Sequence, residues 1–320
     1  MILKPIKNKD EFTQKSEPVI GVFGSKEWLS VYGKNLQLIG IYKDEHQLIG
    51  GFYFLKTKKY GLTFLKLPPY TPHCGLFFVS ESKNKSSISN FSKEVMNAVC
   101  TYFMQQKSAL TILAFPSEII DFQPFIWNKF KVIPNYTYRI NLKNTLETII
   151  TNFDSKNRNV INKAIKEGIS ISSNTINNQE LYQFFKNSLT TAGANVYKKE
   201  LEAIFLNFAN ISNSFALIAK KDTIFLGAVF CVYDANICYY LLGGTDKNSS
   251  TPGINNLLIQ KCIEKAKELG CTIFDFEGSM LKGVEKFFRG FGPELVPYYT
   301  VNKASLPLEF VLKYVKREIF

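Results

Sequence analysis

The chain has 320 residues, of which 46% are hydrophobic and 14% aromatic, and its formal net charge is +12. This composition excludes a disordered or fibrous protein, and at roughly 100–200 residues per domain it predicts two domains. The longest apolar run, 224–233, falls far short of the roughly 20 residues that span a bilayer. No apolar signal segment follows the first lysine, so we expect a cytoplasmic protein.

The residues that usually build metal sites and catalytic triads are scarce. His46 and His73 are the only histidines, and none of the six cysteines forms a C-x-x-C pair. The sequence therefore has few residues that could form a zinc site or a Ser-His-Asp triad, and we predict no bound metal. The scattered lysines are consistent with a solvated surface or with attraction to a polyanion, and the charge alone leaves both interpretations open.

Hydrophobic periodicity predicts the same order of elements in each half of the chain. In the first half we expect strands at 36–42, 48–55, 62–67, 109–115 and 132–142 and helices at 25–32, 88–106 and 122–130. In the second half we expect strands at 169–173, 215–220, 223–233, 236–242, 272–276 and 294–301. The expected helices there are 145–167, 181–190, 199–208, 254–269, 284–289 and 306–319.

Two local similarities support an internal duplication. IYKDEHQLIGGFY at 41–53 aligns without gaps to IAKKDTIFLGAVF at 218–230, and Pro134-Asn-Tyr-Thr resembles Pro297-Tyr-Tyr-Thr. A hairpin followed by helix, strand, helix and strand is the element order of a GNAT domain. We therefore predict an α/β (α+β) protein of two tandem GNAT-like domains, 1–144 and 145–320. Each would have a mixed, mostly antiparallel sheet flanked by helices.

The stretch FDFEGSMLKGVEKFFRGFG at 274–292 carries the most chemical information. Alternate residues of a strand point to the same side, so Asp275 and Glu277 share one face at the end of a buried strand. Acidic residues at such a strand end often face a ligand crevice in an α/β sheet. The alternative, that both carboxylates cap helices or pair with lysines, remains open at this point.

The same stretch resembles the C-terminal signature of FemAB-like proteins, in which F-D-F-x-G-S leads to G-V-x-x-F-(K)-x-x-F-G and a Pro-Tyr strand. SKNRNVINKAIKEGISI at 155–171 and YYLLGGTD at 239–246 are also similar to family segments. The matching residues of the signature are Phe274, Asp275, Phe276, Gly278, Ser279, Gly283, Val284, Phe287, Phe291, Gly292, Pro297 and Tyr298.

The resemblance implies an acyltransferase or aminoacyltransferase in which an amine attacks an activated acyl ester or thioester without a covalent intermediate. Asp275 or Glu277 would take the proton of the acceptor, and Tyr240 would orient the substrate or relay a proton. The expected substrate-binding residues are Lys156, Arg158, Lys163, Phe287, Arg289 and Tyr298. For the basic residues of 155–167, an exposed helix face is the structural alternative.

Three departures from the family pattern bear on the donor. Phe288 stands where tRNA-using members have a lysine, and no long charged helical hairpin is inserted in the second domain. The usual acetyl-CoA loop is replaced by GGTDKNSSTPGINN at 243–256, although amides at the start of the following helix could still hold a phosphate. We therefore expect no tightly bound cofactor and leave the donor as aminoacyl-tRNA or acyl-CoA.

The acceptor is expected to be an amine, on a cell-envelope (peptidoglycan) precursor such as a nucleotide- or lipid-linked muropeptide. An acyl-CoA-dependent enzyme for a small metabolite or exopolysaccharide is the alternative, and a non-catalytic tRNA-binding protein is an alternative of another class. The stiff loop 68–78, PPYTPHCGLFF, offers His73 as a proton carrier or forms a structural turn.

Overall fold

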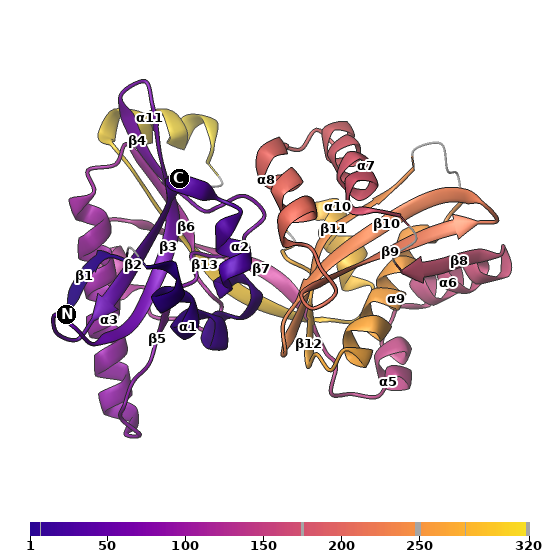
Figure 1. Ribbon diagram of the computed structural model, residues 1–320, viewed down its shortest axis with the longest axis horizontal. Coiled ribbons are helices and arrows are strands. Elements are labelled where there is room, and N and C mark those ends of the chain that lie inside the picture. Colours follow the sequence, from indigo (N-terminus) through magenta and orange to yellow (C-terminus); the bar gives the residue numbers. More distant parts are fainter. Residues whose placement is uncertain (7, 174–175, 247–250, 279, 318–320) are drawn as a thin grey trace. The chain divides into compact units, whose positions relative to one another are not determined.

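The computed structural model describes residues 1–6, 8–173, 176–246, 251–278 and 280–317 (Figure 1). The chain forms two compact units. Unit 1 comprises Met1–Asn135 and Pro297–Phe320, and unit 2 comprises Tyr136–Val296. The chain thus leaves unit 1 once, completes unit 2, and returns to unit 1.

Unit 1 is built from short and medium strands with one long helix. Its strands are β1 (Ile2–Pro5), β2 (Leu36–Tyr42), β3 (Leu48–Lys59), β4 (Leu62–Lys66), β5 (Phe77–Phe78) and β6 (Leu110–Ala114). Its α-helices are α1 (Lys9–Ile20), α2 (Lys26–Ser30), α3 (Lys85–Gln105), α4 (Gln123–Trp127) and α11 (Leu306–Val315). Its 3-10 turns are η1 (Gly21–Gly24) and η2 (Gly33–Asn35).

Unit 2 has the same mixture of elements. Its strands are β8 (Ile169–Ser173), β9 (Ser214–Lys221), β10 (Ile224–Tyr233), β11 (Ile237–Thr245) and β12 (Ile273–Asp275). Its helices are α5 (Leu146–Thr151), α6 (Ser155–Lys166), α7 (Asn178–Thr191), α8 (Lys198–Ala203), α9 (Ile254–Glu268) and α10 (Lys282–Arg289), with a π-helical turn η3 (Ile204–Phe208). Two further strands, β7 (Lys131–Asn141) and β13 (Glu294–Ala304), carry the chain from one unit to the other.

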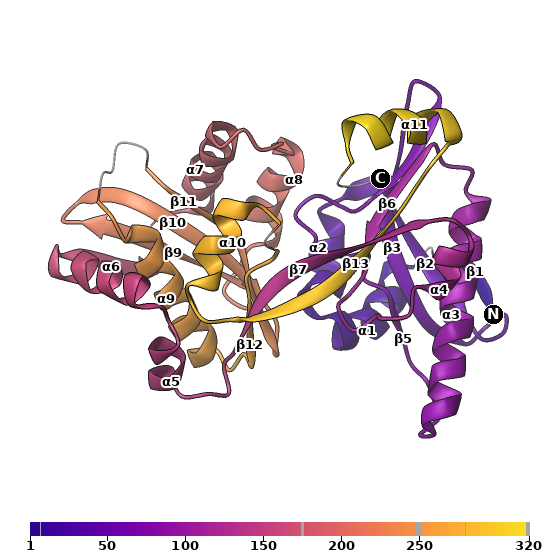
Figure 2. The same cartoon turned by 180° about the vertical axis from the view of Figure 1, so that it is seen from behind.

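The sheets of the two units have the same topology. In unit 1 the strand order is β1-β2-β3-β4-β6-β13, and in unit 2 it is β8-β9-β10-β11-β12-β7. Every pair is antiparallel except β4–β6 and β11–β12. A parallel pair needs a crossover connection, which α3 provides in unit 1 and α9 in unit 2 (Figures 1 and 2). The mixed sheets confirm the predicted fold class.

The last strand of each half of the sequence pairs with the sheet of the other half. β7 ends the first half but pairs antiparallel with β12, whereas β13 ends the second half and pairs antiparallel with β6. The sequence predicts one boundary at 144/145, whereas the contacts of the structure place two, at 135/136 and 296/297. The exchanged strands explain this difference, because each strand belongs to the sheet that it extends.

The predicted repeat 41–53/218–230 is a hairpin in both units, β2–β3 and β9–β10. Its shared glycines have the same role. A side chain on Gly50 would meet the Phe77 carbonyl oxygen of β5, and one on Gly227 would lie 2.6 Å from the Gly244 carbonyl oxygen of β11. In each unit the hairpin therefore needs a glycine where the backbone of the next segment comes close.

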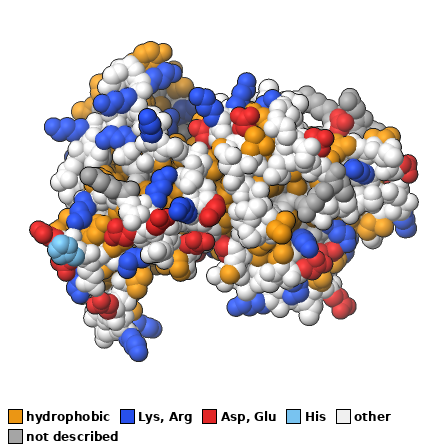
Figure 3. Space-filling view, in the orientation of Figure 1, with side chains coloured by type: hydrophobic (Ala, Val, Ile, Leu, Met, Phe, Trp, Pro, Cys, Tyr) orange, Lys and Arg blue, Asp and Glu red, His pale blue; other side chains and the backbone are white. Residues whose placement is uncertain are grey.

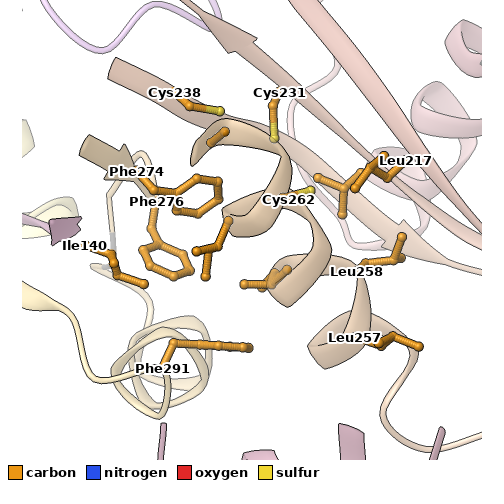
Figure 4. Close-up of a cluster of buried hydrophobic side chains, with 14 of the residues drawn as sticks. Ile140, Leu217, Cys231, Cys238, Leu257, Leu258, Cys262, Phe274, Phe276 and Phe291 are labelled. Carbon is orange, nitrogen blue, oxygen red and sulfur yellow. The ribbon is translucent and has the colours of Figure 1, made fainter. Parts of the chain in front are cut away.

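The core of unit 2 lies between its sheet and α9. Cys231, Cys238 and Phe274 from the sheet contact Leu258 and Cys262 of α9 in one buried cluster, which Figure 4 shows. The other labelled residues in Figure 4 come from β7, β9, α9 and the chain just beyond β12 and α10: Ile140, Leu217, Leu257, Phe276 and Phe291. All described cysteines are free and buried.

Two long predicted helices are each divided in the structure. The segment 145–167 forms α5 and α6, because Asp154 caps a new helix by accepting the Asn157 N–H at 2.6 Å. The segment 199–208 forms α8 followed by η3. Gly168, just beyond α6, has a φ of +79°, which agrees with its predicted role as a helix-terminating glycine.

Candidate functional site at the end of strand β12

The carboxylate of Asp275, at the end of β12, receives hydrogen bonds from three directions. Arg139 Nε donates to Oδ2 at 2.7 Å, and the Thr137 hydroxyl donates to Oδ1 at 2.6 Å. The backbone N–H of Glu277 donates to Oδ1 at 2.9 Å. The Asp275 side chain is only 4% exposed. Because both of its oxygens are engaged, the Asp275 side chain is held in place and organises its neighbours.

Strand register explains why these residues meet. Asp275 lies opposite Arg139 in the antiparallel β7–β12 ladder and opposite Tyr239 in the parallel β11–β12 ladder. Residues that lie opposite each other share a face of the sheet, so Arg139, Asp275 and Tyr239 project to one side. Phe274 and Phe276 belong to the core on the other side. The alternation predicted from the sequence thus holds at Asp275.

Glu277 follows β12 in a backbone conformation that few residues adopt. Its φ is +61°, and Gly278 has a φ of +99°. The Gly278 N–H donates to the Thr137 hydroxyl oxygen at 3.0 Å, which holds the turn against β7. Burial raises the pKa of the Glu277 carboxyl well above its usual range, and the negative charge of Asp275 raises it further, while Arg139 opposes the shift. Such a carboxyl is a stronger base than an ordinary glutamate when it ionises.

Tyr239 completes this group on β11. It is buried, and burial raises the pKa of its hydroxyl, with further contributions from Asp234, Asp275 and Glu277. A tyrosine that keeps its proton can donate to an oxygen or relay a proton. The sequence analysis missed Tyr239, Thr137 and Arg139. Strand alternation across the Tyr239-Tyr240 pair could have indicated Tyr239, but no local signal shows that β7 pairs with β12.

Tyr240 lies on the opposite face of β11. Its ring centroid is 5.7 Å from that of Phe288 and 6.4 Å from that of Phe276. Burial raises the pKa of its hydroxyl. The structure therefore does not bring Tyr240 together with Asp275 and Glu277, and places it beside the core.

Three of the predicted basic residues, Lys156, Arg158 and Lys163, lie on α6. Arg158 donates from Nη1 to the backbone oxygens of Thr151 and Phe153 at the end of α5. Lys163 pairs with Glu167 at 3.7 Å, and Lys156 is exposed. These contacts agree with the structural alternative of an exposed helix face, in which Arg158 stabilises the α5–α6 corner.

Arg289 and Phe287 lie on α10. Arg289 is 62% exposed and donates from Nε to the Glu285 carboxylate at 2.7 Å, and Tyr138 donates to the same Glu285 oxygen at 2.8 Å. These two hydrogen bonds lower the pKa of Glu285. Phe287 is half-buried against Phe291, with ring centroids 5.4 Å apart. Arg289 is thus held at the surface by its own helix.

Two residues that the sequence analysis names as candidates, Tyr298 and His73, lie in unit 1. Tyr298 is a half-buried residue of β13. His73 accepts a hydrogen bond at Nδ1 from the Gly75 N–H at 3.1 Å, and its ring meets Phe23 edge-on at 5.9 Å between centroids. The loop around His73 therefore has the geometry of a structural turn.

Two glycines at the end of α10, of which Gly292 belongs to the predicted signature, position α10 on the α5–α6 corner. A side chain on Gly290 would reach Asn157 and Asp154, and one on Gly292, whose φ is +64°, would overlap the Asn152 carbonyl. Phe291 packs edge-on against Phe153 with centroids 5.1 Å apart. Much of the signature therefore specifies packing. Ser279 lies outside the described residues.

Among the described residues, the ladder between β11 and β12 ends at Tyr239, whereas β11 itself continues to Thr245. An extended chain that carries amides could pair with this stretch of β11. The next helix, α9, begins after Gly253, and within the described part of the chain no side chain caps its first N–H groups. Of the predicted loop 243–256, residues 247–250 lie outside the described part.

Within the described ranges, no group of three or more His, Cys, Asp or Glu side chains could hold a metal ion. Among the helices described here, none is both long and apolar enough to cross a membrane.

Comparisons with known proteins bear on the family and on the fold. Residues 200–289 match the acetyltransferase (GNAT) domain family, a stretch that lies within unit 2. The chain is similar to the crystal structure of FemX, with 13% identity and a TM-score of 0.67, and 98% of this chain and 99% of that chain are covered. No curated protein sequence matches the chain.

Two further solved structures have the same fold over nearly their whole length. One is the C-terminal domain (DUF2156) of a putative lysylphosphatidylglycerol synthetase from Agrobacterium fabrum, with 10% identity, a TM-score of 0.56 and coverages of 95% and 96% of this and that chain. The other is a tandem GNAT protein from the clavulanic acid biosynthesis pathway, with 8% identity, a TM-score of 0.54 and coverages of 94% and 98%. At these identities the structures establish the fold.

Residues 200–289 of unit 2 thus carry the match to the acetyltransferase (GNAT) domain, and the chain as a whole has the doubled fold of a tandem GNAT protein. The fold that the chain shares with FemX accords with the resemblance of its sequence motifs to FemAB-like proteins.

Proposed function

We propose that unit 2 transfers an activated acyl or aminoacyl group to an amine, with Glu277 as the base. The observation that carries the proposal is the position of Glu277 in a turn directly after Asp275, whose carboxylate oxygens are already engaged by Arg139, Thr137 and the Glu277 N–H. Burial and the neighbouring negative charge raise the pKa of Glu277 in this position. Of the two acids predicted from the sequence, Glu277 is therefore the proton acceptor and Asp275 is its support.

The proposed reaction is a single displacement. The amine nitrogen attacks the acyl carbonyl carbon, the new C–N bond forms, and the C–O or C–S bond to the donor breaks. The proton that the amine loses passes to the ionised Glu277 carboxylate, and the donor leaves as an alcohol or thiol after protonation. The buried hydroxyl of Tyr239 on the same face is the nearest candidate to stabilise the developing oxyanion or protonate the leaving group.

We further propose that the acceptor amine belongs to a cell-envelope precursor, a nucleotide- or lipid-linked muropeptide, and that the chain acts in the cytoplasm. The support is the fold shared with FemX over almost the whole of both chains. The donor would then be an aminoacyl-tRNA. The +12 net charge favours association with tRNA and with phosphate-bearing acceptors.

A second candidate donor is acyl-CoA. The stretch of β11 beyond Tyr239, where the described ladder with β12 has ended, suits an extended donor with amide groups, and the start of α9 suits its phosphates. Phe288, a core residue in place of the lysine of tRNA-using relatives, also favours acyl-CoA. The acceptor would in this case be an amine of a small metabolite or polysaccharide.

A transfer assay separates these candidates. The purified chain is given an amine-bearing muropeptide precursor with either charged tRNA or a series of acyl-CoAs, and amide formation is followed by mass spectrometry. The rate should rise with pH through an apparent pKa above that of an ordinary glutamate, and Glu277→Gln should abolish it. Transfer that persists in Glu277→Gln would reject the proposed base, and binding of generic RNA without transfer from either donor would reject the reaction.

A further inference from the structure

Helix α11 carries an apolar stripe that no described part of the protein covers. Leu306, Phe310 and Tyr314 follow one another at intervals of four residues, so they lie on one side of the helix. Phe310 is 80% exposed and Tyr314 is 87% exposed. Val311 and Val315 are also exposed and widen the stripe. Exposed apolar faces of this kind mark interaction surfaces.

The polar side of α11 and its flanks is mainly basic. The segment 303–317 contains four basic residues and one acidic residue. The acidic residue, Glu309, already pairs with Lys313 at 2.8 Å. An apolar stripe beside basic residues is the pattern of helices that lie in the plane of a membrane interface.

The β3–β4 hairpin adds to this surface. The segment 56–66 contains four lysines and no acidic residue, and Tyr60 at its turn is 90% exposed with a φ of +52°. Lys59 Nζ lies 5.2 Å from the centroid of the Tyr60 ring. Figures 1 and 2 both show this hairpin and α11 at the same end of unit 1, and Figure 3 shows Lys and Arg side chains around apolar ones there.

We propose that this basic apolar face, formed by α11 and the tip of the β3–β4 hairpin, docks on an anionic membrane surface. Phe310, Tyr314 and Tyr60 would enter the interfacial region, where aromatic rings are favoured, and the lysines would remain among the lipid headgroups. The lysines of the β3–β4 hairpin and the basic residues at the end of α11 give this face a positive charge, so anionic lipid is the complementary partner.

Charge also argues against the other occupants of an apolar face. A symmetric dimer through this face would place the lysines of 56–66 and of 303–317 against their own copies, which like-charge repulsion opposes. The phosphates of RNA would pair with the lysines, but RNA would not bury the aliphatic residues of the stripe, Leu306, Val311 and Val315. A bilayer interface satisfies both the charge and the apolar stripe.

Vesicle co-sedimentation of the full chain tests the proposal without reference to catalysis, so its failure is distinct from failure of the proposed reaction. Wild-type protein should sediment with phosphatidylcholine vesicles that contain phosphatidylglycerol but not with phosphatidylcholine alone, and less so in high salt. Phe310→Ser combined with Tyr314→Ser removes two interfacial aromatic rings, and Lys58→Ser combined with Lys59→Ser removes two charges that attract anionic lipid. Each double variant should weaken binding about tenfold or more.

Matched controls keep the result specific. Ile211→Ser removes an equally exposed apolar side chain from unit 2, and Lys83→Ser with Lys85→Ser removes two exposed lysines near the start of α3, at the other end of unit 1 from α11. Both should bind vesicles as the wild type does. Equal loss in test and control variants, no binding to anionic vesicles, a dimer that Phe310→Ser dissociates, or preference for tRNA over vesicles would each overturn the proposal.

Discussion

Arg139 and Asp275 lie opposite each other on β7 and β12, and Arg139 Nε donates to Asp275 Oδ2 at 2.7 Å. One partner comes from the closing strand of the first half of the sequence and the other from the second half. The ion pair therefore joins the exchanged strand β7 to the sheet of unit 2 at the place where the candidate base, Glu277, begins its turn.

Arg139→Met should destabilise unit 2 strongly, because it leaves the nearly buried Asp275 carboxylate without its countercharge. We expect a loss of about 3–5 kcal/mol in the free energy of unfolding, measured by urea denaturation. The matched control is Arg289→Met, which breaks an exposed pair with Glu285 and should cost about 1 kcal/mol or less. Equal losses in the two variants would show that the Arg139–Asp275 pair is no more important than a surface pair.

Glu277→Gln should change how stability depends on pH. The folded pKa of Glu277 is raised above its ordinary value of 4.5, so the folded state holds this proton more tightly than the unfolded chain does. The protonated Glu277 side chain therefore contributes its full stabilisation below the pKa of the unfolded chain. This stabilisation is lost as the pH rises through the pKa of the folded state. Because glutamine cannot ionise, the melting temperature of the variant should exceed that of the wild type increasingly from about pH 4.5 upward.

Glu285→Gln should change the pH dependence of the melting temperature in the opposite direction from Glu277→Gln. Hydrogen bonds from Arg289 and Tyr138 lower the pKa of Glu285, so its contribution is present above the unfolded pKa and lost as pH falls. This variant should melt below the wild type at neutral pH, and the difference should shrink in acid. A Glu277→Gln difference that stays constant with pH would mean that Glu277 does not titrate as described.

Several features of unit 2 can be predicted from the sequence because they depend only on neighbouring residues. The β12 strand, the placement of Asp275 opposite the apolar face, and the glycine at the end of α6 all follow from side-chain alternation and backbone chemistry. The doubled topology was likewise visible as two hairpins with a shared glycine, Gly50 and Gly227. Each of these features depends on residues close together in the chain.

The partners of Asp275 could not be predicted in the same way. Thr137 and Arg139 lie more than a hundred residues away, and they reach Asp275 only because β7 pairs with the other sheet. Periodicity shows that a strand exists but not which strand it joins. The sequence indicates Tyr240 rather than Tyr239 as the catalytic tyrosine for a related reason. Which of the two side chains shares a face with Asp275 depends on the register of β11 with β12.

Gly292→Ala and Gly283→Ala should have opposite effects on stability, although both glycines belong to the family signature. Gly292 has a φ of +64° and no room for a side chain beside the Asn152 carbonyl, so alanine should cost at least about 1–2 kcal/mol. Gly283 lies in α10 with no atom near its missing side chain, so alanine should stabilise by up to about 1 kcal/mol. Thermal and urea unfolding of the pair would decide whether the signature encodes packing as argued.

Phe288→Lys restores the lysine that tRNA-using relatives have in this motif, and the structure predicts that it harms the fold. Phe288 is buried, and its ring lies 4.6 Å from that of Phe276 and 5.7 Å from that of Tyr240, measured between centroids. Removing the ring costs about 3–5 kcal/mol by analogy with large-to-small core changes, and burying an ammonium adds to that. The neighbouring half-buried Phe287 provides the control, since Phe287→Lys can extend its amine into solvent and should lose less. A Phe288→Lys protein that kept its stability and gained transfer from charged tRNA would instead mean that this position faces the substrate, and that the chain lost its donor specificity through one substitution.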